Sequence, residues 1–197
     1  MSRTAYVVTM DAVSPQASFV TNLLHKSGFK VEHVKPILNT DLVIANKLTI
    51  QEIYKRIIKS GEYGYIFEDD INVHEDVTVN EIMLYEHLSP RFFYLGVCTY
   101  GDCDIAKKLR METVNGKNIW VMTTGVRGHH AVGVSPLGAT ELLERSEKDD
   151  EKYMDVILEK YCEQYPANSL RHEFESSVYG HRGLFYRDYD RFHRNKN

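Results

Sequence analysis

The stretch Tyr65-Ile-Phe-Glu68-Asp69-Asp70-Ile-Asn-Val73 is an apolar strand that ends in three adjacent carboxylates and then resumes. Three like charges at one strand end repel one another and lose solvation, so they cost free energy unless a positive charge lies among them. Oxygen ligands on a rigid strand edge suit Mg²⁺ or Mn²⁺, which keeps waters and shares its coordination shell with substrate phosphates. The pattern indicates a site where a bound metal ion coordinates the diphosphate of a substrate. The alternative interpretation is a solvated acidic turn.

The acidic strand follows an alternation of strands and helices. Ser14 is placed to cap the first helix, with Pro15 at its first position. This alternation predicts an α/β fold with a parallel sheet, in which ligands bind outside the carboxyl ends of the strands. Thr9 and Asp11 lie at that end of the first strand. The expected elements are strand 5–10, helix 16–26, strand 31–34, helix 50–60 and the acidic strand.

The second half changes character, and its last part is rich in His, Arg and Tyr. We expect residues 172–197 to fold over a ligand rather than to build the core, because they lack apolar periodicity. The polar run 101–116 predicts a loop. The other expected elements are a short helix 81–88, strands 91–98, 119–123 and 131–134, a helix opened by Ser135 and Pro136, and a helix 149–164.

Length and composition favour one globular domain, since the chain has 197 residues, is 43% hydrophobic and shows no repeat or linker. The net charge is −4 and the basic residues are scattered, which argues against a nucleic-acid-binding surface. Three cysteines without metal-type spacing indicate a reducing compartment. The N-terminus resembles neither a signal peptide nor a membrane span, so we expect a cytoplasmic protein without a transmembrane segment.

Three segments together resemble glycosyltransferase family 25, which includes lipopolysaccharide and collagen sugar transferases. The first is the 50–60 helix with Gly61-Glu-Tyr-Gly-Tyr-Ile-Phe-Glu-Asp-Asp-Ile71, similar to the family's helix and acidic strand. The second is Gly128-His-His-Ala-Val-Gly-Val-Ser-Pro-Leu-Gly-Ala-Thr-Glu-Leu-Leu143, and the third is Tyr153-Met-Asp-Val-Ile-Leu158. The resemblance spans roughly residues 5–165. The chain is also similar in size to the small glycosyltransferases of large algal viruses.

The resemblance implies a single GT-A-type, Rossmann-like domain with a mostly parallel central sheet flanked by helices. A nucleotide-sugar-binding half would cover about residues 1–100 and an acceptor-binding half about 101–197. The implied activity is metal-dependent, inverting transfer of a hexose from a nucleoside diphosphate sugar, with UDP favoured, to a glycan or other hydroxyl acceptor. The implied cofactor is Mn²⁺ or Mg²⁺. A virus-encoded protein acting in the host cytoplasm fits this resemblance.

The chain departs from the family pattern at two places, so the acceptor is not carried over. The Gly133-Val134 segment lacks the usual Tyr, and Asn46-Lys-Leu-Thr49 stands where a Ser-His pair is common.

The three residues of the acidic triplet point to different faces of the strand, so we expect them to have different roles. We expect Asp70 to bind the metal, and Glu68, two residues earlier on the same face, to reach the ribose or a metal-bound water. Asp69 points to the other face, where it would hold a neighbouring Arg or Lys. By resemblance to GT-A enzymes, His181 in Gly180-His-Arg-Gly183 would complete the metal shell. Arg182 beside it would clamp the diphosphate.

The remaining candidates lie outside the triplet. Thr9 and Asp11 would meet the nucleobase or ribose, unless they only form a capping turn, and Lys47 would contact the base or a phosphate, unless it is simply solvated. His129 and His130 are candidates for binding the acceptor sugar, with a structural role for one of them as the alternative. Inverting transfer needs a carboxylate base, and the resemblance places Asp155 in this role.

Two other functions stay open at this point. One is a non-catalytic domain that binds nucleotide sugars. The other is a metal-dependent phosphatase or phosphotransferase, for which Asp11 lacks the flanking Asp-x-Asp spacing of a nucleophile.

Overall fold

The computed structural model describes residues 3–73, 76–98, 110–114, 116–122, 127–170 and 181–188. Its N-terminal half alternates strands and helices as the sequence predicts. The strands β1 (Thr4–Val8), β2 (Lys30–Val34) and β3 (Gly64–Glu68) run parallel in the order β2-β1-β3, with α1 (Pro15–Lys26) and α2 (Leu42–Ser60) as the connections. Ser14 caps α1 as expected, since its side chain accepts a hydrogen bond from the backbone of Ala17.

The second half extends this sheet with strands of both directions. β8 (Arg127–Val134) lies antiparallel between β3 and β5 (Phe92–Cys98), and β5 pairs in parallel with β9 (Ala167–Leu170). β7 (Lys117–Met122), β6 (Arg110–Val114) and β10 (His181–Gly183) are added in antiparallel fashion. The predicted α/β fold is confirmed: the sheet is parallel at β2-β1-β3, mixed beyond it and flanked by helices, which is consistent with a GT-A-type domain.

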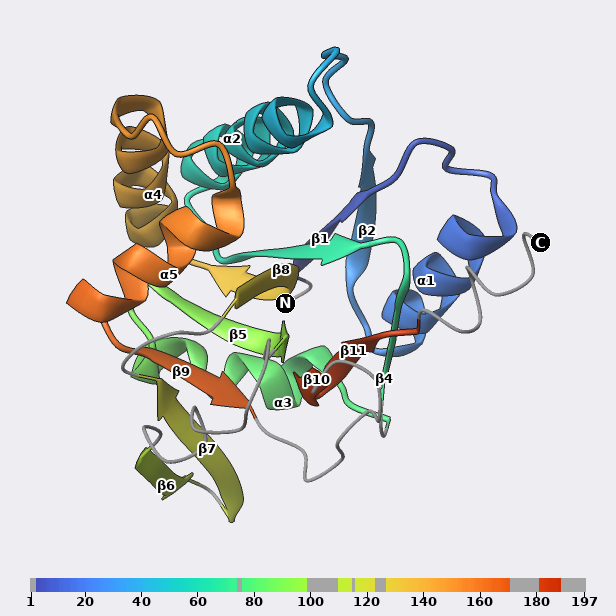
Figure 1. Ribbon diagram of the computed structural model, residues 1–197. Helices are drawn as coiled ribbons and strands as arrows, with labels where there is room; N and C mark the ends of the chain where they lie inside the picture. Colours follow the sequence, from blue (N-terminus) through green and yellow to red (C-terminus); the bar gives the residue numbers. More distant parts are fainter. Residues whose placement is uncertain are drawn as a thin grey trace.

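Alternating side chains of the strands build two cores, one on each face of the sheet (Figure 1). On one face, Tyr6 and Ile66 pack with α2, α4 (Pro136–Lys148) and α5 (Met154–Gln164). On the other face, Val7 and Phe67 pack with α1 and the short helix α3 (Val79–Met83). The helices of the first face converge near the end of β3, and this convergence forms the site described below.

A small two-stranded sheet follows the acidic triplet. β4 (Ile71–Val73) pairs with β11 (Phe185–Arg187), and Phe185 is fully buried in the second core. The expectation that residues 172–197 do not build the core is therefore wrong for this strand. The sequence pattern hid it because only Leu184 and Phe185 are apolar there, and a strand of three residues shows almost no periodicity.

Several other predicted elements differ from the structure. Helix α2 begins eight residues earlier than predicted, because the Asp41 side chain caps it at Val43 and Ile44. Helix α5 begins five residues later, at Met154. Part of the predicted polar loop 101–116 is strand β6, in which the backbone pairs with β7. A 3-10 helix (Glu86–Leu88) ends the region predicted as helix 81–88. None of the helices in the described part of the chain is long and apolar enough to span a membrane.

Candidate functional site

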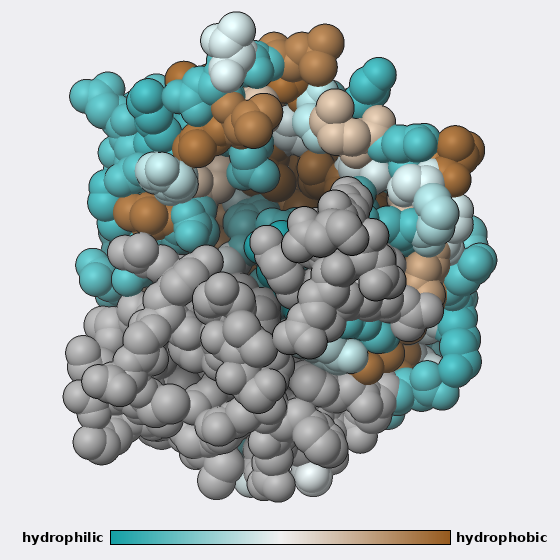
Figure 2. All heavy atoms as spheres, turned by 45° about the vertical axis from the view of Figure 1, so that its right-hand side comes forward, coloured by the Kyte–Doolittle hydropathy of each residue, from teal (hydrophilic) through white to brown (hydrophobic). Residues whose placement is uncertain are grey.

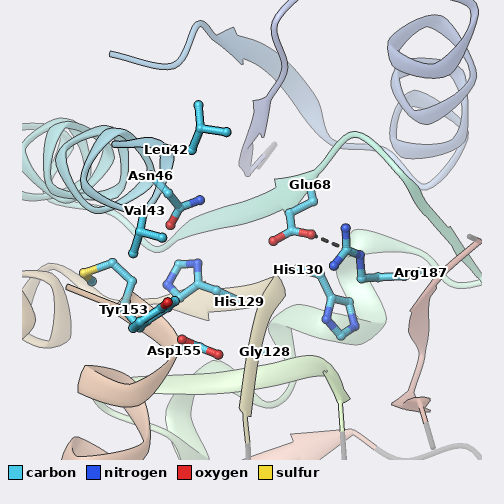
Figure 3. Close-up of a pocket in the computed structure, with 11 residues that line it drawn as sticks. Leu42, Val43, Asn46, Glu68, Gly128, His129, His130, Tyr153, Asp155 and Arg187 are labelled. Atoms are coloured by element: carbon cyan, nitrogen blue, oxygen red, sulfur yellow. Dashed lines mark ion pairs between the residues drawn. The ribbon is translucent and has the colours of Figure 1, made fainter. Parts of the chain in front are cut away.

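A cavity of about 260 Å³ lies at the carboxyl end of β3, between the first turns of α2 and α5 (Figure 3). Its lining combines carboxylates, two histidines, an arginine and an apolar wall. The residues that line it are Leu42, Val43, Asn46, Glu68, Gly128, His129, His130, Tyr153, Met154, Asp155 and Arg187.

The sheet direction explains why these residues meet. β3 ends at Glu68, and β8 runs antiparallel to it, with Ala131 opposite Phe67. The beginning of β8, which carries His129 and His130, therefore lies at the same edge as the end of β3. Both α2 and α5 begin at this edge, so the partial positive charges of two helix N-termini lie near the cavity.

Apolar residues are exposed around the same edge of the sheet. Met10 and Val13 follow β1, Leu38 precedes α2, and Leu42 begins it; all four are more than half exposed. In Figure 2, brown apolar side chains border a recess among teal polar ones. A concave site with apolar walls and a few charged groups is the usual form of a small-molecule site.

Glu68 occupies the most acidic part of the cavity. Burial raises the pKa of Glu68, and the Arg187 guanidinium, 3.3 Å away, lowers it. The neighbouring carboxylates of Asp70, Asp69 and Asp155 raise it further, to about 7. The site therefore holds more negative than positive charge among the described residues, and an additional cation would be stabilised there.

Asp70 is buried beneath this position, with only 2% of its surface exposed. Its Oδ2 accepts hydrogen bonds from Arg187 Nε (2.9 Å) and Nη2 (2.6 Å). Its backbone carbonyl accepts a further bond from the amide of Asp188. Asp70 thus ties β11 to the acidic end of β3 through both side chain and main chain.

His129 is a neutral imidazole at the cavity wall. Its Nε2 lies 3.1 Å from the hydroxyl of Tyr54, a fully buried residue of α2. Burial lowers the pKa of His129 to about 4, against a weaker effect of its own backbone that raises the pKa. His130 is also buried and packs against Gly96 of β5. A Cβ atom added at Gly96 would lie only 2.5 Å from His130 Nε2. Both histidines are thus held firmly by the fold.

Asp155 lies in the first turn of α5, where a carboxylate is favoured by the free backbone amides. Its Oδ1 accepts a hydrogen bond from the amide of Val156. The connection before it is fixed to α2, because Lys47 Nζ donates to the carbonyl oxygens of Asp149 (2.9 Å) and Glu151 (2.7 Å). The wall that carries Asp155 is thereby held at a defined distance from α2.

The structure brings Glu68, Asp155, His129 and His130 of the predicted set to one cavity. It also shows the partners of other candidates. Thr9 and Asp11 form a local turn, in which the amide of Asp11 donates to Thr9 Oγ1. Asp69 accepts a hydrogen bond from Gln16 rather than from a cation. Lys47 donates hydrogen bonds to the carbonyl oxygens of Asp149 and Glu151. The side chains of His181 and Arg182 lie outside the described part of the structure.

Sequence reasoning missed Arg187, Asn46 and Tyr153. Arg187 left almost no sequence signal, because the strand that carries it has only three residues and pairs with a strand more than one hundred positions away. Asn46 enters the site only because α2 begins earlier than predicted, and Tyr153 only because α5 begins later.

The carboxylates of this site have the chemistry of an Mg²⁺ or Mn²⁺ ligand set, and the neighbouring carboxylates, which together with burial raise the pKa of Glu68, would favour a cation there. Among the described residues, no group of three or more His, Cys, Asp and Glu side chains is arranged to hold a metal. Such ions commonly use one or two carboxylates, with waters and substrate phosphates completing the shell. Glu68 lines the cavity and fits that smaller requirement, whereas Asp70, the predicted metal ligand, is buried and accepts two hydrogen bonds from Arg187.

Comparisons with known proteins give only distant likenesses. No protein-family model and no curated protein sequence matches the chain. Among solved structures, the protein A197 from STIV aligns with 11% identity and a TM-score of 0.44, covering 89% of this chain and 87% of that one. A glycosyltransferase involved in the glycosylation of the major capsid of PBCV-1 aligns with 10% identity and a TM-score of 0.45, covering 84% and 76%. Membership of family 25 stays a prediction.

Proposed function

We propose that this protein is a glycosyltransferase that moves a sugar, a hexose by resemblance, from a nucleoside diphosphate donor to a hydroxyl acceptor. The observation that carries the proposal is the shared cavity of Glu68, Asp155 and Arg187 at the carboxyl end of β3. A donor of this kind has an apolar ring system and a charged diphosphate. The cavity offers an apolar wall from Leu42 and Val43 beside charged groups, which matches both parts.

In the proposed reaction, Asp155 accepts the proton of the acceptor hydroxyl. The acceptor oxygen then forms a bond to the anomeric carbon, the bond from that carbon to the phosphate oxygen breaks, and the nucleoside diphosphate leaves with the electron pair. His129 and Asn46 line the same cavity as Asp155 and would hydrogen-bond the acceptor or the transferred sugar. Attack from the side opposite to the leaving group inverts the anomeric centre.

The proposed metal, Mn²⁺ or Mg²⁺, would be held by Glu68, with waters and the phosphates of the donor completing its shell. Bound there, it would supply positive charge to the leaving diphosphate, and charge of this kind is among the largest contributions to such reactions. The charge balance supports it, because a diphosphate would otherwise meet Glu68 and Asp155 with Arg187 as the one cation among the described residues that line the cavity.

The test measures nucleoside diphosphate release and sugar transfer with Mn²⁺ and a panel of UDP-, GDP- and ADP-linked sugars. We expect the Asp155→Asn variant to lose roughly 100-fold or more in transfer while it keeps its affinity for the nucleoside diphosphate. Asp150→Asn, which changes an exposed carboxylate in the same connection, is the matched control and should be fully active.

Other outcomes would point to the alternative functions. Tight binding of a nucleotide sugar without turnover would indicate a non-catalytic binding domain. Phosphate release from a simple phosphoester, without sugar transfer, would indicate a phosphatase.

A further inference from the structure

Arg187 has no role in the proposed reaction, although it lines the cavity next to Glu68. Its side chain is about one-third exposed, and its guanidinium is the only cationic group among the described residues of the cavity wall. The other candidate cation nearby, Lys47, bonds backbone carbonyl groups of the connection before α5. An anionic ligand that enters the cavity would therefore meet Arg187 first among the described cations.

The guanidinium is held in a fixed orientation by its buried partner. Both Nε and Nη2 donate to the same oxygen of Asp70, at 2.9 Å and 2.6 Å. The backbone adds to this, because Arg187 stands opposite Ile71 in the β4–β11 ladder and the amide of Asp188 donates to the carbonyl oxygen of Asp70. Asn72 donates to the carboxylate of Asp188 as well, so the strand ends are joined on both sides of Arg187.

This arrangement resembles a prepared anion contact more than a surface ion pair. A planar guanidinium matches two phosphate oxygens at once, which a lysine ammonium does not. A side chain that is already ordered loses less conformational entropy when the ligand binds. In addition, the buried Asp70 carboxylate does not line the cavity, whereas Arg187 does (Figure 3).

We propose that Arg187 binds the diphosphate of the donor and that Asp70 is the positioning residue that orients it. The proposal rests on the function proposed above, and it adds a residue and a ligand contact to it. It also gives Asp70 a role that does not depend on a metal. The segment near the C-terminus thereby becomes part of the donor site through β11, although it is more than one hundred residues away from the acidic triplet in the sequence.

The test uses the full-length protein in EDTA, so that any loss of a metal ligand has no effect. The ligand is whichever of UDP, GDP and ADP the wild type binds, and the corresponding nucleoside serves as a second ligand. We expect Arg187→Gln to weaken binding of the nucleoside diphosphate by about 10- to 100-fold, the range of a charge-assisted hydrogen-bond pair. Affinity for the nucleoside should stay unchanged, because it carries no phosphate.

Asp70→Asn is the matched variant, since it breaks the same ion pair but leaves the guanidinium in place. We expect it to weaken diphosphate binding by only a few-fold. If both variants lost the same affinity, Arg187 would be a structural partner of Asp70 and the proposal would be overturned. Unchanged binding by Arg187→Gln would overturn it as well.

The double variant Asp70→Asn/Arg187→Gln is the control for a folding defect, because it removes both charges of the pair and leaves neither one buried alone. It should bind the nucleoside diphosphate as weakly as Arg187→Gln does, and wild-type affinity would contradict the proposal. A wild type that binds no nucleoside diphosphate at all, with or without Mn²⁺, would instead overturn the proposed function together with this inference.

Discussion

Lys47→Met tests whether the cavity wall that carries Asp155 is held in place by α2. Lys47 Nζ donates to the carbonyl oxygens of Asp149 and Glu151, at 2.9 Å and 2.7 Å, and these residues belong to the connection that leads into α5. Methionine keeps most of the apolar length of the side chain and removes the ammonium group. The variant therefore isolates the two hydrogen bonds from the packing of the stem.

The expected loss of stability follows from the geometry. A hydrogen bond to a charged group contributes roughly 1.5–3 kcal/mol, and the partial exposure of this pair lowers that value, so we expect a total of about 2 kcal/mol. For a domain of this size, that corresponds to a decrease in Tm of roughly 4–8 °C or in the urea midpoint of about 1 M.

The assay combines urea unfolding with amide hydrogen exchange. In Lys47→Met, the amides of residues 149–155 should exchange faster, while those of β1 and β3 stay as slow as in the wild type. Lys55→Met, an exposed lysine of the same helix, is the control and should change stability by less than about 0.5 kcal/mol. Wild-type stability and wild-type exchange at residues 149–155 in Lys47→Met would refute the reasoning.

Two further predictions concern the buried residues beside the cavity. The pKa of His129 is lowered to about 4, so its protonation favours the unfolded chain, and His129 alone should lower the free energy of unfolding by about 2 kcal/mol between pH 7 and pH 5, against the opposite change from Glu68, whose pKa is raised to about 7. Urea unfolding at both pH values should therefore show that acidification is less destabilising in His129→Asn than in the wild type by about 2 kcal/mol, and an equal change in both proteins would contradict the assignment. Gly96→Ala would place a Cβ 2.2 Å from the Phe185 carbonyl oxygen and should cost about 3 kcal/mol, the upper range for overpacking. Gly116→Ala, with no atom within 4 Å of the new Cβ but a positive φ of 74°, should cost about 1 kcal/mol in the same urea unfolding assay, and equal losses would argue against the close approach at Gly96.

The N-terminal half of the fold could be predicted from local sequence signals. The helix cap at Ser14, the left-handed Gly61 at the end of α2 and the apolar strands all act within a few residues, so their patterns are visible in the chain. The acidic end of β3 was also predictable, because in a parallel sheet the strand ends share one edge. The same reasoning placed Asp11 at that edge, although in the structure it forms a turn with Thr9.

The partners of the acidic triplet could not be predicted, because they depend on contacts between distant segments. The Asp70–Arg187 pair joins residues that are 117 positions apart, and β11 has only three residues. Lys47 was expected to face the ligand, since nothing in the sequence shows that the connection at 149–151 lies within its reach. The resemblance to a family predicted Asp155 as the catalytic base; Asp155 lines the cavity, and its role stays a prediction.

The most direct measurement is a crystal structure of the protein with Mn²⁺ and the nucleoside diphosphate that it binds. We predict density for the diphosphate against the Arg187 guanidinium, with Asp155 facing the position that the departed sugar would have occupied. A nucleotide bound elsewhere, for example in the charged groove between α4 and α5 at Arg145 and Lys148, would contradict the account. So would an empty cavity in crystals saturated with both ligands.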